Sequence, residues 1–76
     1  PSDPVRIAID TDGSIFWNGS IVTDAMLVDQ MKIAATAKEP PVLDIAAANG
    51  AAYEDVARVL AEAKVQGLAR VEFVER

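Results

Sequence analysis

The last third of the chain constrains the fold most, because residues 50–74 read as a helix that ends at a glycine and continues into a strand. Small and apolar residues recur there at helical spacing, a pattern typical of a core-facing stripe: Ala52, Val56, Val59, Leu60 and Ala63. Gly67 stands where a left-handed residue commonly ends a helix. In the following "ARVEFV", alternation places Val71 and Phe73 on one face of a strand. Such a unit has to pack its stripe against a sheet.

The first 19 residues predict a β-hairpin. "VRIAID", residues 5–10, alternates apolar and polar side chains with the period of a half-buried strand. Asp12-Gly13 is a strong turn signal, because glycine accepts a positive φ without steric cost. "SIFWN", residues 14–18, then returns as a second strand that closes at Asn18-Gly19.

A first helix should follow the hairpin. Thr23 can cap it, and Asp24 suits the positive end of its dipole. Leu27, Met31 and Ala34 recur at helical spacing and predict its core stripe. The prolines of Pro40-Pro41 are expected to end the helix.

The next apolar run, "PVLDIA", predicts a strand with Leu43 and Ile45 facing inward. The predicted order is therefore β-β-α-β-α-β, an α+β fold in one small domain. Because helical crossovers join parallel strands with right-handed connections, we expect a four-stranded mixed sheet with two helices on one face. The opposite face is left bare.

Composition limits the partners and the sources of stability. A chain of 76 residues buries a thin core, and with no cysteine it has no disulfide to support it. Self-association, most simply a homodimer, is the remaining support. A net charge of -5 argues against nucleic acid or an anionic lipid surface, because both require a basic face.

The residue types also argue against catalysis. The chain has no histidine and no cysteine, so the commonest general base, nucleophile and metal ligand are missing. Asp10 and Asp12 are close in sequence, but "DTDGS" is foremost a turn. We therefore predict no enzyme activity, no catalytic residue, no metal site and no cofactor.

A bare sheet points instead to a binding role. Trp17, or Phe16 on the other side of the same strand, can be presented to a partner or packed in the core. The outer strands are expected to be residues 5–10 or residues 69–74, and an added strand would pair with one of them. The predicted contact residues are Val5, Arg6, Ile7, Trp17, Phe73 and Val74.

Two long segments resemble one known family. They are "IAIDTDGSIFWNGSIVTDAMLVDQMK" and "PVLDIAAANGAAYEDVARVLAEAKVQGLARVEFV", and together they cover nearly the whole chain. Their DG turn, Asn-Gly tip, Val-Thr helix start, "YEDV" helix and final glycine resemble the periplasmic domain of the ExbD/TolR family. ExbD is the closer of the two, because the hairpin strands and the "YEDV" helix resemble it more.

Two positions depart from the family pattern. Ala48 stands where an aspartate usually follows the strand alanine, and Ala52 precedes Tyr53. Both changes reduce capping of the second helix, so Asn49 is the expected substitute cap. The resemblance implies that residues 1–76 are the periplasmic domain of a single-pass inner-membrane protein, in a fragment without its N-terminus and transmembrane helix.

The resemblance also implies a function. ExbD-like subunits work with an ExbB stator subunit in a complex driven by the proton motive force, and they energise TonB-dependent transport across the outer membrane. A TonB-like protein is then the expected partner of this domain, and Phe73 falls at a functionally important apolar position of the last strand. The alternative is a TolR-like subunit that binds peptidoglycan and maintains the envelope.

Overall fold

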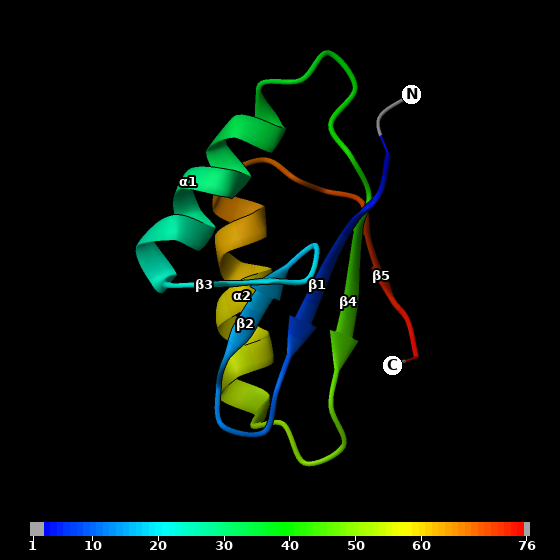
Figure 1. Cartoon of the computed structure of the whole chain (residues 1–76). Helices are drawn as coiled ribbons and strands as arrows, with labels where there is room; N and C mark the ends of the chain where they lie inside the picture. Colours follow the sequence, from blue (N-terminus) through cyan, green and yellow to red (C-terminus); the bar gives the residue numbers. More distant parts are fainter. Residues whose placement is uncertain (1–2, 76) are drawn as a thin grey trace.

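Two parallel strands form the centre of the sheet. In the structure, a computed structural model that describes residues 3–75, β1 (Val5–Ile9) pairs with β4 (Leu43–Ala47). The sheet order is β3-β2-β1-β4-β5, with β2 and β3 antiparallel to their neighbours and β5 parallel to β4 (Figure 1). The remaining elements are β2 (Ile15–Trp17), β3 (Ser20–Val22), α1 (Asp24–Ala35), α2 (Tyr53–Val65) and β5 (Val71–Phe73).

The α+β class and the mixed sheet are as predicted, but the sheet has one more strand than the four expected. The additional strand is β3, which pairs with β2 after a two-residue turn. Asn18 and Gly19 both have positive φ, 49° and 88°, the backbone of the turn that best joins twisted antiparallel strands. The turn at Asn18-Gly19 therefore starts another strand, where the sequence suggested the end of the hairpin.

Both helices cover the same face of the sheet, as predicted. Leu27 and Met31 of α1 and Val59 and Ala63 of α2 share one core with the inward side chains of the strands. The buried strand residues are Val5, Ile7, Ile9, Ile15, Leu43 and Ile45. In Figure 1 α2 lies behind β2 and β3 and α1 lies beside them, so the uncovered face of the sheet is turned toward the viewer.

Helix α1 begins as predicted and ends earlier than predicted. The Thr23 hydroxyl accepts a hydrogen bond from the Met26 N–H at 3.1 Å. The helix stops at Ala35, because the N–H and hydroxyl of Thr36 both donate to the Ile33 carbonyl, at 3.1 and 2.7 Å. The Pro40-Pro41 pair therefore lies in the loop and does not end the helix.

Helix α2 has a weak start and a strong end. Ala52 occupies the N-cap without a side-chain hydrogen bond, so the prediction that Asn49 caps this helix is wrong. At the other end Gly67 has φ +80°, and the N–H of Leu68 donates to the Ala63 carbonyl at 2.9 Å. This is the Schellman arrangement, and it directs Leu68 into the core.

One arginine ties the two helices to each other. The Arg58 guanidinium on α2 lies 3.7 Å from a carboxylate oxygen of Asp24 on α1 and 3.5 Å from one of Asp55. Because Arg58 and Asp24 are largely exposed, this contact contributes little to stability. Within residues 3–75, neither helix is long and apolar enough to cross a membrane.

Gly67→Val should destabilise the domain by about 1 kcal/mol or more, because a β-branched residue is strained at positive φ. An added Cβ would meet nothing within 4 Å, so the loss reports backbone conformation alone. Asn tolerates this conformation better, so Gly67→Asn is the matched control and should lose less. Urea unfolding measures both variants, and equal stability of the Val variant and the unmodified chain would contradict this description of the helix end.

Ala52→Ser should stabilise the domain by about 0.5–1 kcal/mol, because a serine hydroxyl can accept from an N–H of the first turn of α2. Ala52 already has the extended backbone of an N-cap, with φ -69° and ψ 136°. The reciprocal variant is Thr23→Ala at the capped start of α1, and it should lose about 1 kcal/mol. Thermal unfolding of the two variants tests the pair, and a gain with Thr23→Ala would refute the assignment of caps.

Candidate functional site

The candidate site is the β5 edge of the sheet. β5 pairs only with β4 among the described strands, and its other side faces outward. Its ends are held by two backbone bonds of 2.9 Å, from the Leu43 N–H to the Arg70 carbonyl and from the Val74 N–H to the Ile45 carbonyl. The strand is thus fixed in place while one row of its backbone groups can accept another strand.

The helix side of this edge is incompletely covered. Phe73 lies opposite Ile45 and on the same face, yet Phe73 is 65% exposed while Ile45 is 1% exposed. Of the residues of β5, Val71 packs against the core and Phe73 does not. The end of the outermost strand on the side away from α1 is therefore left beyond the helices (Figure 1).

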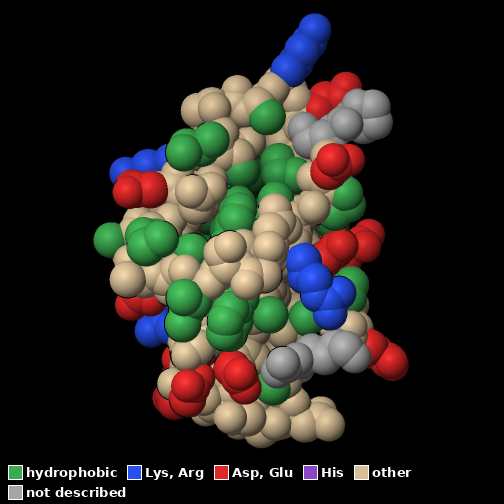
Figure 2. All heavy atoms as spheres, in the orientation of Figure 1, with side chains coloured by type: hydrophobic (Ala, Val, Ile, Leu, Met, Phe, Trp, Pro, Cys, Tyr) green, Lys and Arg blue, Asp and Glu red, His purple; other side chains and the backbone are tan. Residues whose placement is uncertain are grey.

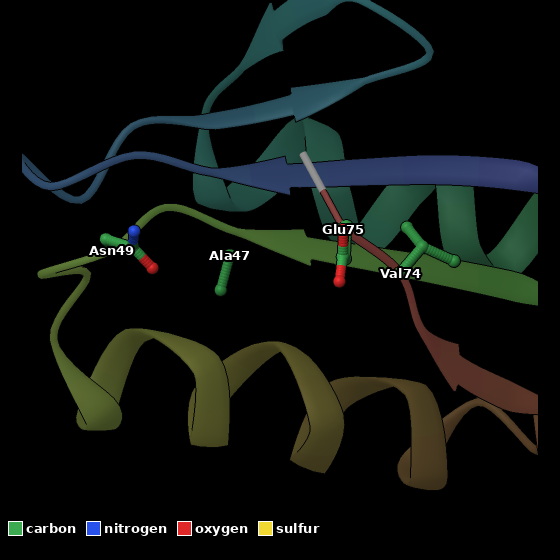
Figure 3. Close-up of a pocket in the computed structure, with 4 residues that line it drawn as sticks. All are labelled: Ala47, Asn49, Val74 and Glu75. Atoms are coloured by element: carbon green, nitrogen blue, oxygen red, sulfur yellow. The ribbon is translucent and has the colours of Figure 1, made fainter.

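Two hollows flank β5. The first, about 330 Å³, is lined mainly by apolar residues at the start of the strand: Leu60, Lys64, Gly67, Leu68, Ala69 and Val71. The second, about 450 Å³, lies past its end and is lined by Ala47, Asn49, Val74 and Glu75. In Figure 3 Ala47 points from β4 toward α2. β5 ends opposite Ile45 and does not extend beside Ala47. Both hollows could receive side chains of a segment laid along β5.

The uncovered face of the sheet carries two rows of side chains. The apolar row is set by the strand register and comprises Ile21, Phe16, Ala8 and Ala46. Ile21 is 61% exposed, whereas Phe16 and Ala8 are half-buried and Ala46 is buried. Phe16, Ala8 and Ala46 in this row are each less exposed than Phe73 at the β5 edge, which favours the edge over the face as the site.

The second row is charged. Arg6, Asp44 and Glu72 lie side by side across β1, β4 and β5. The Arg6 guanidinium donates to the Glu75 carbonyl at 3.2 Å, and so it reaches across β4 to the end of the chain. Figure 2 shows hydrophobic side chains over the middle of this face and charged ones toward the β4 and β5 side. Asp44 and Glu72 are thus two adjacent carboxylates at the β5 end of this row, with Arg6 on the far side of Asp44.

The predicted contact residues are not brought together in one place. Val5 and Ile7 are buried in the core, and Trp17 packs against it, on the helix side of the sheet. The expectation that residues 5–10 form an outer strand is wrong, because β1 is paired on both sides.

Three of the six predicted residues lie near the edge. Phe73 is in β5, Val74 follows it, and Arg6 reaches the same end of the chain through its side chain. A binding role for any of the six stays a prediction. Asp44 and Glu72 were absent from the predicted set, although period-2 alternation already places both on the polar side of their strands.

The hairpin turn accounts for the closely spaced aspartates. The Ser14 N–H donates to Asp12 Oδ1 at 2.9 Å, and this backbone bond, with the Ser14 hydroxyl, lowers the pKa of the Asp12 carboxyl. The carboxylate therefore stabilises a turn. In residues 3–75 there is no cluster of three acidic side chains arranged to hold a metal ion.

Comparison with known proteins gives the family. The sequence matches the family described as biopolymer transport protein ExbD/TolR over residues 1–76. It is also 34% identical over 77 aligned residues to the biopolymer transport protein exbD2 of Xanthomonas campestris pv. campestris. That alignment includes 99% of this chain and 57% of the relative, so the chain spans little more than half the relative's length. The chain therefore belongs to the ExbD/TolR family of biopolymer transport proteins.

Proposed function

We propose that this chain is the periplasmic, partner-binding domain of an ExbD-like subunit that has no catalytic activity of its own. In this proposal the subunit belongs to an inner-membrane complex with an ExbB-like stator. The complex uses the proton motive force to energise TonB-dependent transport. The similarity to exbD2 and the match to the ExbD/TolR family support this assignment.

The observation that carries the proposal is the open β5 edge. An extended segment of a TonB-like protein would add to β5 through main-chain hydrogen bonds, while neighbouring pockets would select its side chains. β5 is short and partnered on one side, and its last residue, Phe73, is largely exposed. An unpaired edge strand can pair with other chains and cause aggregation. Its presence here is therefore consistent with a binding role for β5.

The proposal further includes a homodimer, formed through the opposite edge. β3 carries no charged residue, and Ile21 on it is 61% exposed. Two copies of β3 related by a twofold axis would place Ile21 against its counterpart and continue the sheet. This arrangement leaves β5 available to a TonB-like partner.

Peptides that tile the periplasmic segment of a TonB-like protein should bind the isotopically labelled chain weakly. The amide signals of β5 should shift most, and those around Met31 of α1 should not, because Met31 is fully buried on the far helix. Binding should persist at high salt, since main-chain hydrogen bonds are screened less than exposed charge pairs. Shifts confined to the helices would contradict strand addition.

Sedimentation with purified cell wall is the parallel measurement in that experiment. Retention of the chain on peptidoglycan, together with no response to any TonB-derived peptide, would replace the proposal with the TolR-like function.

Ile21→Glu should abolish self-association, because it would place like charges opposite each other at the proposed twofold contact. Sedimentation equilibrium up to millimolar concentration measures the effect. The matched control is Ile33→Glu, since Ile33 on α1 is 64% exposed and lies outside the sheet. A chain that stays monomeric without any substitution would refute the homodimer.

A further inference from the structure

The two sides of β5 differ in chemistry, and the difference specifies a partner. Val71 and Phe73 lie on the helix side, and Glu72 lies on the uncovered face. A strand added beside β5 also alternates its side chains between these two sides. Each residue of the partner would therefore meet either an apolar surface or a carboxylate.

On the helix side of β5, the partner segment needs apolar residues. Phe73 is 65% exposed at the edge, and the hollow of about 330 Å³ at the start of β5 is lined by Leu60, Leu68 and Val71, among others. A bulky aliphatic or aromatic side chain of the partner would fill this hollow and cover Phe73. Burying apolar area in this way favours association.

On the uncovered face, the partner segment needs a basic residue. Asp44 and Glu72 lie directly opposite each other across β4 and β5, and like charges so placed destabilise a sheet. The nearest cation in this row is Arg6 on the far side of Asp44, and its guanidinium donates to the Glu75 carbonyl. A lysine or arginine opposite Glu72 would relieve the repulsion, and the net charge of -5 would attract it.

We infer that β5 accepts an extended segment in which apolar residues alternate with lysine or arginine, its basic side chains opposite Glu72 and its apolar ones over Phe73. The inference rests on the proposed function, because it names the chemistry of the segment that this edge selects. Main-chain bonds to β5 supply part of the affinity, and the alternation supplies the selectivity.

A second copy of the chain fits β5 less well. In a twofold antiparallel pair centred on Glu72, two glutamates would lie opposite each other. A twofold pair centred on Val71 would place Glu72 opposite Arg70, but the Arg70 guanidinium already donates to the Pro40 carbonyl at 2.8 Å. The edge is therefore better suited to a basic partner than to self-pairing.

The test uses two blocked nine-residue peptides, one alternating lysine with valine and one alternating glutamate with valine. The 76-residue chain should bind the lysine peptide about threefold to tenfold more tightly, with the largest amide shifts in β5. The preference should shrink in 1 M salt, where the Debye length falls to about 3 Å. Equal affinity for both peptides at low salt would overturn the inference.

Two substitutions with matched controls separate the charge from the apolar contact. Glu72→Lys should reverse the preference between the peptides. Asp29→Lys, on the exposed side of α1, makes the same charge change and should leave the preference unchanged. Phe73→Ser should weaken the binding of both peptides. Ile33 is exposed to nearly the same degree, and Ile33→Ser should leave the binding of both peptides unchanged. Equal effects of a substitution and its control would overturn the corresponding contact.

The same measurements separate this inference from the proposed function. If a TonB-derived peptide shifts β5 but Glu72→Lys does not change its affinity, the function stands and the inference fails. If the lysine peptide selects β5 while no TonB-derived peptide binds, the inference stands and the TonB assignment fails. If the β5 signals move with protein concentration and not with peptide, β5 is a self-association surface and the inference fails.

Discussion

The parallel pairing of β1 with β4 is the contact on which the remaining structure depends. Ile7 and Ile45 lie opposite each other in this pair, and both are almost completely buried. Parallel neighbours cannot be joined by a tight turn, so the chain needs a helix to return to the start of the next strand. The central pair therefore requires α1, and the parallel addition of β5 requires α2 in the same way.

This arrangement determines what is exposed. The central strands take the covered position under both helices, and the short strands β3 and β5 form the two edges. β5 lies outermost on the side of the sheet remote from α1, so this edge is left partly open. Phe73 is exposed for this reason although it belongs to the face that forms the core elsewhere. The open edge follows from the strand order, and the proposed binding role uses it.

A small acidic domain of this kind suits a role in which contacts are made and released. The described residues contain no buried charged or polar side chain that would make its interior reactive. Its distinctive chemistry is at the β5 edge, where Asp44 and Glu72 lie on one face of the sheet and the exposed ring of Phe73 lies on the other. Strand addition at such an edge would combine modest affinity with selectivity, as the proposed function requires.

Local sequence signals were sufficient for much of the fold. Thr23, Gly67 and the alternating strands were predictable because a cap, a left-handed residue and a period of two each depend on a few neighbouring residues. The strand β3 was missed, although Asn18-Gly19 is itself a hairpin signal, because its three residues are too few to show a period.

The site depended on long-range order. Residues 5–10 carry the same alternation at the centre of a sheet as at its edge, so their sequence could not reveal that β1 has two neighbours. The opposition of Asp44 and Glu72 likewise exists only in the register between strands 28 residues apart in the chain. The sequence by itself determined all the elements except β3, their inward faces and the resemblance to the family. Only the tertiary structure decided which strand lies at the edge and which charges meet there, because strand order and register are set by packing between distant segments.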